Sequence, residues 1–150
     1  MPSPGLAQAC ARCRDARSPN ARGNQERSLT RVALFITCLI DQLFPQIGDA
    51  TVRVLERAGC TVSFPTAQTC CGQATFNDGF WDEARTLARH FLDTFEGAEQ
   101  IVTPSGSCAA MVREWYPHLF RDSPAEAMRA RAVGQRTYEL SEFLVRELDR

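Results

Sequence analysis

The sequence predicts an α/β fold, and three observations carry that prediction. Short β-branched and aromatic runs of strand length alternate with longer segments in which apolar residues recur at helical spacing. The 150 residues, 44% of them apolar, suffice for one domain with one core. Strands that alternate with helices of this length form right-handed βαβ units. We therefore expect a single domain with a Rossmann-like parallel sheet of short strands flanked by helices.

The first two thirds of the patterned sequence contain three predicted strands and two predicted helices. Residues 32–36 form a continuous apolar run, which is typical of a strand buried on both faces. Residues 45–59 begin with proline, end with glycine and carry apolar residues at helical spacing, so they predict an amphipathic helix. Residues 60–64 and 101–103 predict the second and third strands, and residues 81–97 predict the helix between them.

After the third strand the pattern becomes entirely helical. The turn 104–108 leads into a helix that includes Trp115, and Ser107 is the expected N-cap. A second helix is expected to start at Ser123, where Glu126 completes a capping box. We expect the last helix to start at Thr137. Trp115 and Trp81 fall on apolar helical faces, which favours core packing for both.

The N-terminal segment differs from the rest of the chain. Residues 1–29 contain prolines, glycines and five arginines but no Val, Ile or Phe, so they predict a disordered extension that precedes a folded domain over 30–150. The arginines are not followed by an apolar segment, which argues against a secretory signal peptide and favours a cytoplasmic protein. We expect no transmembrane segment, because no apolar run approaches the roughly 18 residues that span a bilayer.

Charge excludes one class of function. Seventeen basic and eighteen acidic side chains give a net charge of −1, so the chain lacks the positive footprint of a nucleic-acid-binding protein. No glycine-rich phosphate loop or Ser-His-Asp arrangement is visible. His90 and His118 have no cysteine beside them in the sequence, and we expect both to be solvated or at the edge of the core.

Seven cysteines are the most informative residues. An odd number in a reducing compartment argues against a disulfide framework and favours buried thiols, redox chemistry or metal binding. A zinc site at Cys10 and Cys13 would need two further ligands nearby, and none follows before Cys38. We therefore interpret both as incidental thiols of the extension. Cys60 is the first residue of a predicted strand, and we interpret it as a small buried hydrophobic residue.

The other four cysteines follow the carboxyl ends of predicted strands. Cys38 follows the first strand, Cys70 and Cys71 lie in the loop after the second, and Cys108 follows the third. In a parallel α/β sheet these loops converge on one crevice, so the four thiols are expected to meet there.

The adjacent pair restricts what such a site can do. The Cα atoms of Cys70 and Cys71 lie about 3.8 Å apart across a trans peptide, closer than ordinary disulfides accept. On a polynuclear centre they can ligate two different irons, and Gly72 would let the backbone come close. Cys108 lies near a predicted helix N-terminus, which lowers the pKa of its thiol. The residues leave three alternatives open: an iron-sulfur centre, a structural or regulatory zinc module on the same sulfurs, or a cluster-free thiol protein or fragment.

The spacing of these cysteines resembles a known family. Thirty-one residues separate Cys38 from Cys70, the Cys-Cys-Gly unit follows, and thirty-six residues separate Cys71 from Cys108. This pattern resembles the CCG-type cysteine-rich domain family, to which the cysteine-rich subunit of heterodisulfide reductase belongs. The strings FPTAQTCCGQATFNDG and TPSGSCAAMV look most like lactate-utilization members of that family. The Cys-x-x-Cys that usually ends the signature is incomplete, because Met111 takes the place of its second cysteine.

The resemblance implies a function and a ligand set. It implies an iron-sulfur electron-transfer subunit of a complex that oxidises lactate, a 2-hydroxy acid, to pyruvate, together with a ferredoxin-like iron-sulfur subunit and a third subunit. Its cofactor would be a 4Fe-4S cluster held by Cys38, Cys70, Cys71 and Cys108, the non-cubane form of heterodisulfide reductase being one option. Met111 is expected to point towards the same crevice. The resemblance covers only the N-terminal half of a usual member, so we expect a homodimer or a complex.

Overall fold

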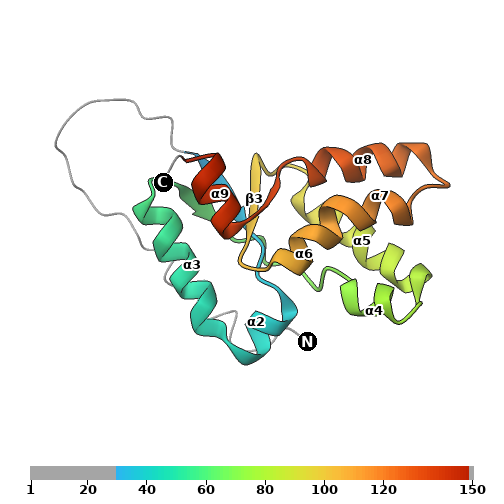
Figure 1. Ribbon diagram of the computed structural model, residues 1–150, viewed down its shortest axis with the longest axis horizontal. Coiled ribbons are helices and arrows are strands. Elements are labelled where there is room, and N and C mark those ends of the chain that lie inside the picture. Colours follow the sequence, from blue (N-terminus) through green and yellow to red (C-terminus); the bar gives the residue numbers. More distant parts are fainter. Residues whose placement is uncertain (1–29, 149–150) are drawn as a thin grey trace.

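The computed structural model describes residues 30–148, which form a four-stranded parallel sheet in the order β2-β1-β3-β4 (Figure 1). The predicted disordered extension over residues 1–29, with Cys10 and Cys13, lies outside the described residues. The predicted α/β class and parallel sheet are confirmed. The strands are β1 (Arg31–Leu34), β2 (Thr61–Ser63), β3 (Gln100–Thr103) and β4 (Thr137–Glu139).

The two central strands are buried on both faces, as their continuous apolar sequences predict. Val32 of β1 lies opposite Val62 of β2 and Gln100 of β3. Because successive side chains of a strand point to opposite faces, β1 supplies residues to two separate cores. Val32, Leu34 and Val102 belong to one core, and Ala33, Phe35 and Ile101 belong to the other.

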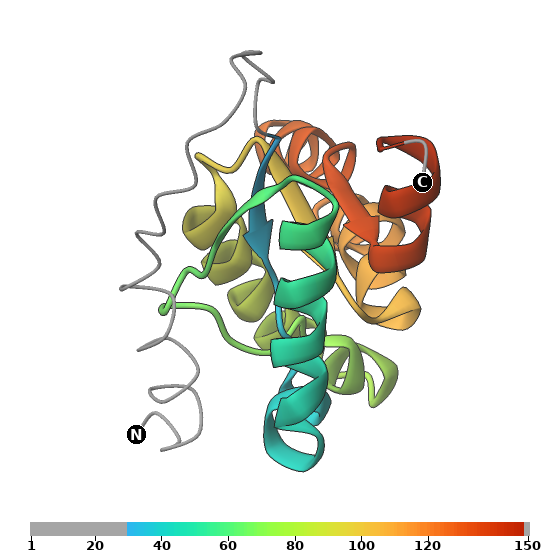
Figure 2. The same cartoon turned by 90° about the vertical axis from the view of Figure 1, so that its left-hand side faces the viewer.

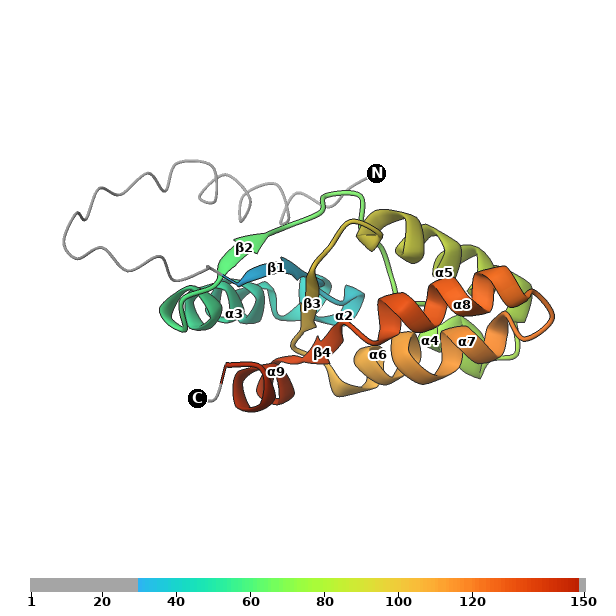
Figure 3. The ribbon, with the colours of Figure 1, turned by 90° about the horizontal axis from the view of Figure 1, so that it is seen from above.

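Helices cover both faces, so the domain has three layers (Figures 1 and 3). On one side α3 and α9 contribute Leu55 and Phe143 to the core. On the other side α5, α6, η1, α7 and α8 enclose the larger core. Within residues 30–148 no helix is long and apolar enough to cross a membrane. The helices are α2 (Cys38–Leu43), α3 (Pro45–Arg57), α4 (Gln73–Asn77), α5 (Trp81–Phe95), α6 (Gly106–Ala110), the π-helical turn η1 (Met111–Trp115), α7 (Tyr116–Leu119), α8 (Pro124–Gly134) and α9 (Leu140–Arg146).

The expectation of three strands and of a last helix starting at Thr137 was wrong. Thr137 opens β4, which pairs with β3, and α9 starts at Leu140. The N-cap of α9 is Glu139, whose carboxylate accepts hydrogen bonds from the backbone N–H groups of Ser141 (2.8 Å) and Glu142 (3.3 Å). The β4 sequence Thr-Tyr-Glu forms no apolar run and leads directly into the helical pattern from Leu140, so pairing with β3 decides its conformation.

Two local expectations near the helix starts also need correction. The N-cap of α6 is Ser105 rather than Ser107, with the Ser105 hydroxyl 3.5 Å from the Cys108 backbone nitrogen. Helix α8 starts after Ser123 as predicted, but Glu126 forms an ion pair with Arg89 of α5 at 2.6 Å. Tertiary partners therefore replace part of the local capping that the sequence suggested.

The two tryptophans are not core residues. Trp81 is 42% exposed and Trp115 is 44% exposed. Both rings lie against Phe76 of α4, with ring centroids 6.1 Å and 5.3 Å away respectively. These rings form an aromatic surface that joins α4, α5 and η1.

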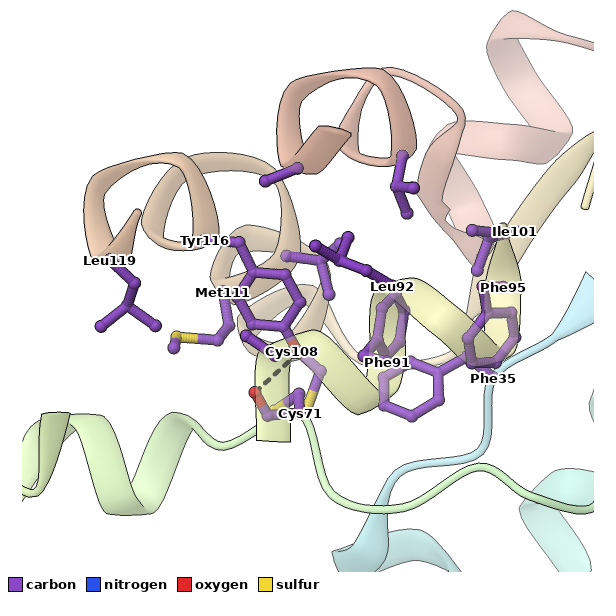
Figure 4. Close-up of a cluster of buried hydrophobic side chains, with 14 of the residues drawn as sticks. Phe35, Cys71, Phe91, Leu92, Phe95, Ile101, Cys108, Met111, Tyr116 and Leu119 are labelled. Atoms are coloured by element: carbon purple, nitrogen blue, oxygen red, sulfur yellow. Dashed lines mark hydrogen bonds between the residues drawn. The ribbon is translucent and has the colours of Figure 1, made fainter. Parts of the chain in front are cut away.

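An aromatic cluster fixes α5 against the end of β1. The Phe35 ring lies edge-on to Phe91 and Phe95, with centroids 4.9 Å and 5.7 Å away. Phe91 also contacts Tyr116 of α7 at 5.6 Å (Figure 4). Such aromatic pairs each stabilise a core by about 0.5–1.5 kcal/mol beyond burial. The same buried core contains Cys71 and Cys108.

Gly134 sets how closely α8 approaches η1, and its replacement tests this packing. A Cβ atom at Gly134 would lie 3.1 Å from the Arg113 Cα. Because backbone atoms cannot move aside easily, we expect Gly134→Ala to lower the free energy of unfolding by about 1–3 kcal/mol, measured by urea denaturation. Gly97→Ala is the control, since its Cβ would meet nothing within 4 Å. Equal stability of the two variants would contradict the described packing.

Candidate metal centre

The four cysteines predicted to converge lie on loops and helix starts at the carboxyl edge of the sheet. Cys38 is the first residue of α2, four positions after the last residue of β1, and its helix is capped by the Thr37 side chain. Cys70 and Cys71 precede α4, and Cys108 lies in the first turn of α6 after β3. All four are free thiols. Cys38 is exposed and Cys70 is half-buried, whereas Cys71 and Cys108 are buried.

The four thiols form a continuous chain of contacts. The Cys38 thiol donates to the Cys70 sulfur at 3.4 Å. The Cys71 thiol is hydrogen-bonded to both Cys70 and Cys108. Within residues 30–148, no three or more His, Cys, Asp or Glu side chains surround a single metal-ion position. The thiols therefore form a series of neighbours, Cys38, Cys70, Cys71 and Cys108, from the exposed to the buried members, which we call the line of sulfurs.

Charge alternates along this line, beginning at the surface. The hydrogen bond from Cys71 lowers the pKa of Cys70 to about 5, helped by the Gly72 backbone N–H at 3.4 Å and by the Cys38 thiol. Burial, followed by the hydrogen bond to Cys70, raises the pKa of Cys38 to about 11. Cys70 is thus the thiolate and Cys38 keeps the proton.

The inner half of the line repeats this arrangement. The Cys71 hydrogen bond lowers the pKa of Cys108 to about 6, and the Ser105 and Ser107 hydroxyls act in the same direction. The hydrogen bond to Cys108 raises the pKa of Cys71 well above its ordinary value. The expected lowering at Cys108 is confirmed in direction, but neighbouring hydroxyls and a thiol cause it.

Gly72 has the backbone conformation that the Cys-Cys-Gly unit requires. Its φ of 79° lies in the left-handed region, which side chains other than glycine rarely adopt. A Cβ atom there would also lie 3.3 Å from the Leu87 Cβ on α5. The close approach that Gly72 allows is therefore an approach to α5. The left-handed conformation of Gly72 turns the chain from Cys71 into α4.

Tyr116 supports the inner thiols, and no pattern in the sequence pointed to it. Its hydroxyl donates to the Cys71 carbonyl oxygen at 2.9 Å, fully buried (Figure 4). Burial raises the pKa of Tyr116 well above its ordinary value, so the hydroxyl remains a donor. A tyrosine within a helical apolar pattern is predicted to be a packing residue, and only the tertiary structure shows its hydrogen bond.

Met111 shares the buried cluster of Cys71 and Cys108. Met111 was expected to point towards the crevice of the cysteines. Figure 4 instead shows its thioether extending towards Leu119 and away from both thiols. Cys60 is buried in the core on the other face of the sheet, which confirms its interpretation as a small hydrophobic residue. His90 and His118 are both exposed, as expected.

The sequence of this cysteine-bearing region also matches a known protein family. The model of the CCG cysteine-rich domain matches residues 32–113, and the chain belongs to this family.

The chain is also similar to curated relatives named lactate utilization protein A. The protein from Bacillus cytotoxicus is 53% identical over 115 residues, which cover 77% of this chain and 48% of the relative. The protein from Bacillus thuringiensis and lactate utilization protein A 2 from Bacillus mycoides are each 52% identical over the same lengths. The chain thus spans about half the length of these relatives. No solved structure gave a significant match.

Alkylation of the cluster-free protein tests the alternation of charge. Because a thiolate is the nucleophile, Cys70 is expected to react with iodoacetamide at a nearly constant rate between pH 6 and pH 8, above its pKa of about 5. Cys38 stays protonated over this range, so its rate is expected to rise about tenfold per pH unit. Peptide mass spectrometry measures both rates. Faster modification of Cys38 than of Cys70 at pH 6.5 would contradict this assignment of charge.

Proposed function

We propose that this domain holds a 4Fe-4S cluster on Cys38, Cys70, Cys71 and Cys108 and transfers electrons in lactate utilization. The observation that carries the proposal is the line of four free thiols drawn from three loops at one edge of the sheet. Soft thiolates are the ligands that iron-sulfur clusters take, and four of them suffice for a 4Fe-4S cluster.

The donor set fits a polynuclear centre. Two of the four sulfurs, those of Cys70 and Cys108, are already poised as thiolates near neutral pH. Adjacent Cys70 and Cys71 bond to different neighbours, Cys38 on one side and Cys108 on the other, which suits ligation of different irons. The Gly72 N–H and the hydroxyls of Ser105 and Ser107 supply hydrogen bonds to sulfur, and such bonds tune a cluster's potential.

When bound, the cluster would supply one-electron transfer. The chain itself divides the site into a buried and an exposed part. Cys71 and Cys108 lie in the larger core beside Tyr116, which excludes water from the inner sulfurs. Cys38 lies at the surface, where an electron donor or acceptor can approach.

The proposed substrate and partners rest on the relatives. The names of the relatives concern lactate utilization, and we propose that this domain serves the oxidation of lactate, a 2-hydroxy acid, to pyruvate. A ferredoxin-like iron-sulfur subunit and a third subunit are the proposed partners. Exposed apolar side chains beside Cys38 offer a contact surface for them or for a second copy of this chain. They are Leu39, Leu43 and Phe44.

Anaerobic reconstitution with iron and sulfide tests the proposed ligands. We expect the full chain to turn brown, and Cys70→Ser and Cys71→Ser each to lose most of the visible absorption, because a ligand sulfur is removed. Cys60→Ser is the matched control, since Cys60 lies on the other face of the sheet. Iron content and absorption spectra give the result. Equal iron binding by all three variants would show that the site lies elsewhere, and a colourless protein with bound zinc would favour a zinc module.

A further inference from the structure

The side chain of Gln68 joins the two loops that carry Cys38 and Cys70. Its Oε1 accepts a hydrogen bond from the Ile36 backbone N–H at 2.8 Å. Its Nε2 donates to the Leu34 carbonyl oxygen at 3.1 Å and to the Pro65 carbonyl oxygen at 3.0 Å. One half-buried carboxamide therefore satisfies three backbone groups in two separate segments.

These contacts reproduce the hydrogen bonding of a parallel strand. A residue in a parallel strand accepts from one residue of its neighbour and donates to the residue two positions earlier. Gln68 does the same to Ile36 and Leu34. The true neighbour, β2, ends at Ser63, and Pro65 has no N–H to continue the ladder. The Gln68 side chain thus extends the sheet by one step beyond β2.

The extension lies directly beside the outer thiols. Ile36 precedes Cys38 by two residues, and Gln68 precedes Cys70 by two residues. The segment between β1 and Cys38 is also held from the side of β3, because the Phe35 N–H donates to the Val102 carbonyl oxygen at 2.9 Å. His90 of α5 holds the loop of Gln68 from a further direction, through the Ala67 carbonyl oxygen at 2.6 Å from its Nε2.

We propose that Gln68 is a positioning residue that fixes the Cys38 and Cys70 sulfurs at their contact distance of 3.4 Å. It acts through the two backbones and touches neither sulfur. For the cluster this inference rests on the proposed function, since Gln68 would set the spacing of the two outer ligands. For the cluster-free chain it stands alone, because the two thiols meet without metal.

Disulfide formation in the cluster-free full chain measures this spacing directly. Diamide, an azo oxidant, takes up two electrons and two protons as the Cys38 and Cys70 thiols each lose hydrogen and form one S–S bond. We expect Gln68→Met, which is similar in length but cannot form the three hydrogen bonds, to form the Cys38–Cys70 linkage about five to ten times more slowly than the wild type. Peptide mass spectrometry quantifies the linked peptide. Gln135→Met is the control, because Gln135 is an exposed residue after α8.

A second variant keeps the test valid if Gln68→Met does not fold. Gln68→Glu can still accept from the Ile36 N–H, but its carboxylate has no donor for the Leu34 and Pro65 carbonyl oxygens. It is also expected to slow the linkage. A folded variant with the wild-type rate of Cys38–Cys70 linkage would overturn the inference.

Cluster retention separates this inference from the proposed function. If the reconstituted wild type holds a cluster, we expect Gln68→Met to lose iron to a chelator several times faster and to show an altered electron paramagnetic resonance spectrum of the reduced cluster. If the wild type binds no cluster while Gln68→Met still slows the disulfide, the proposed function fails and the positioning role stands.

Discussion

The domain depends on a parallel sheet whose two central strands must be covered on both faces. Parallel strands need crossover connections, and those connections place helices on each side of the sheet. Strand β1 illustrates the consequence, because Leu34 enters one core and Phe35 enters the other. The same connectivity leaves the ends of β1, β2 and β3 at one edge, which brings the loops with the cysteines together.

The four thiols are organised by their neighbours as much as by each other. The hydrogen bonds from Cys71 do most to lower the pKa values of Cys70 and Cys108, and the Gly72 N–H and the Ser105 hydroxyl act in the same direction. Tyr116 holds the Cys71 carbonyl from the core side, and Gln68 ties the backbones of the outer loops together. Hydrogen bonds thus hold the backbones on both sides of the sulfurs, and contacts of this kind orient the ligands of a metal centre.

Much of the fold and the positions of the four cysteines could be predicted from the sequence. Strands β1 and β3 are continuous apolar runs, and the position of cysteines after strands predicted their convergence on one edge. Strand β4 could not be predicted, because Thr137–Glu139 form no apolar run and the strand depends on pairing with the edge of β3. The exposed positions of Trp81 and Trp115 were missed because helical periodicity cannot distinguish the core from an aromatic surface around Phe76. The roles of Gln68 and Tyr116 depend on partners about 32 and 45 positions away in the chain, and a single glutamine or tyrosine leaves no local pattern.

Figure 2 shows α3 running along one side of the sheet, with α2 at its end. Cys38, the first residue of α2, is exposed. The proposed role of the domain depends on the cluster. The most direct test of the cluster is the iron and acid-labile sulfide content of the full chain isolated without oxygen, together with its Mössbauer spectrum. We expect about four irons and four sulfides per chain, with thiolate-ligated iron. Stoichiometric zinc with no acid-labile sulfide would contradict the proposal.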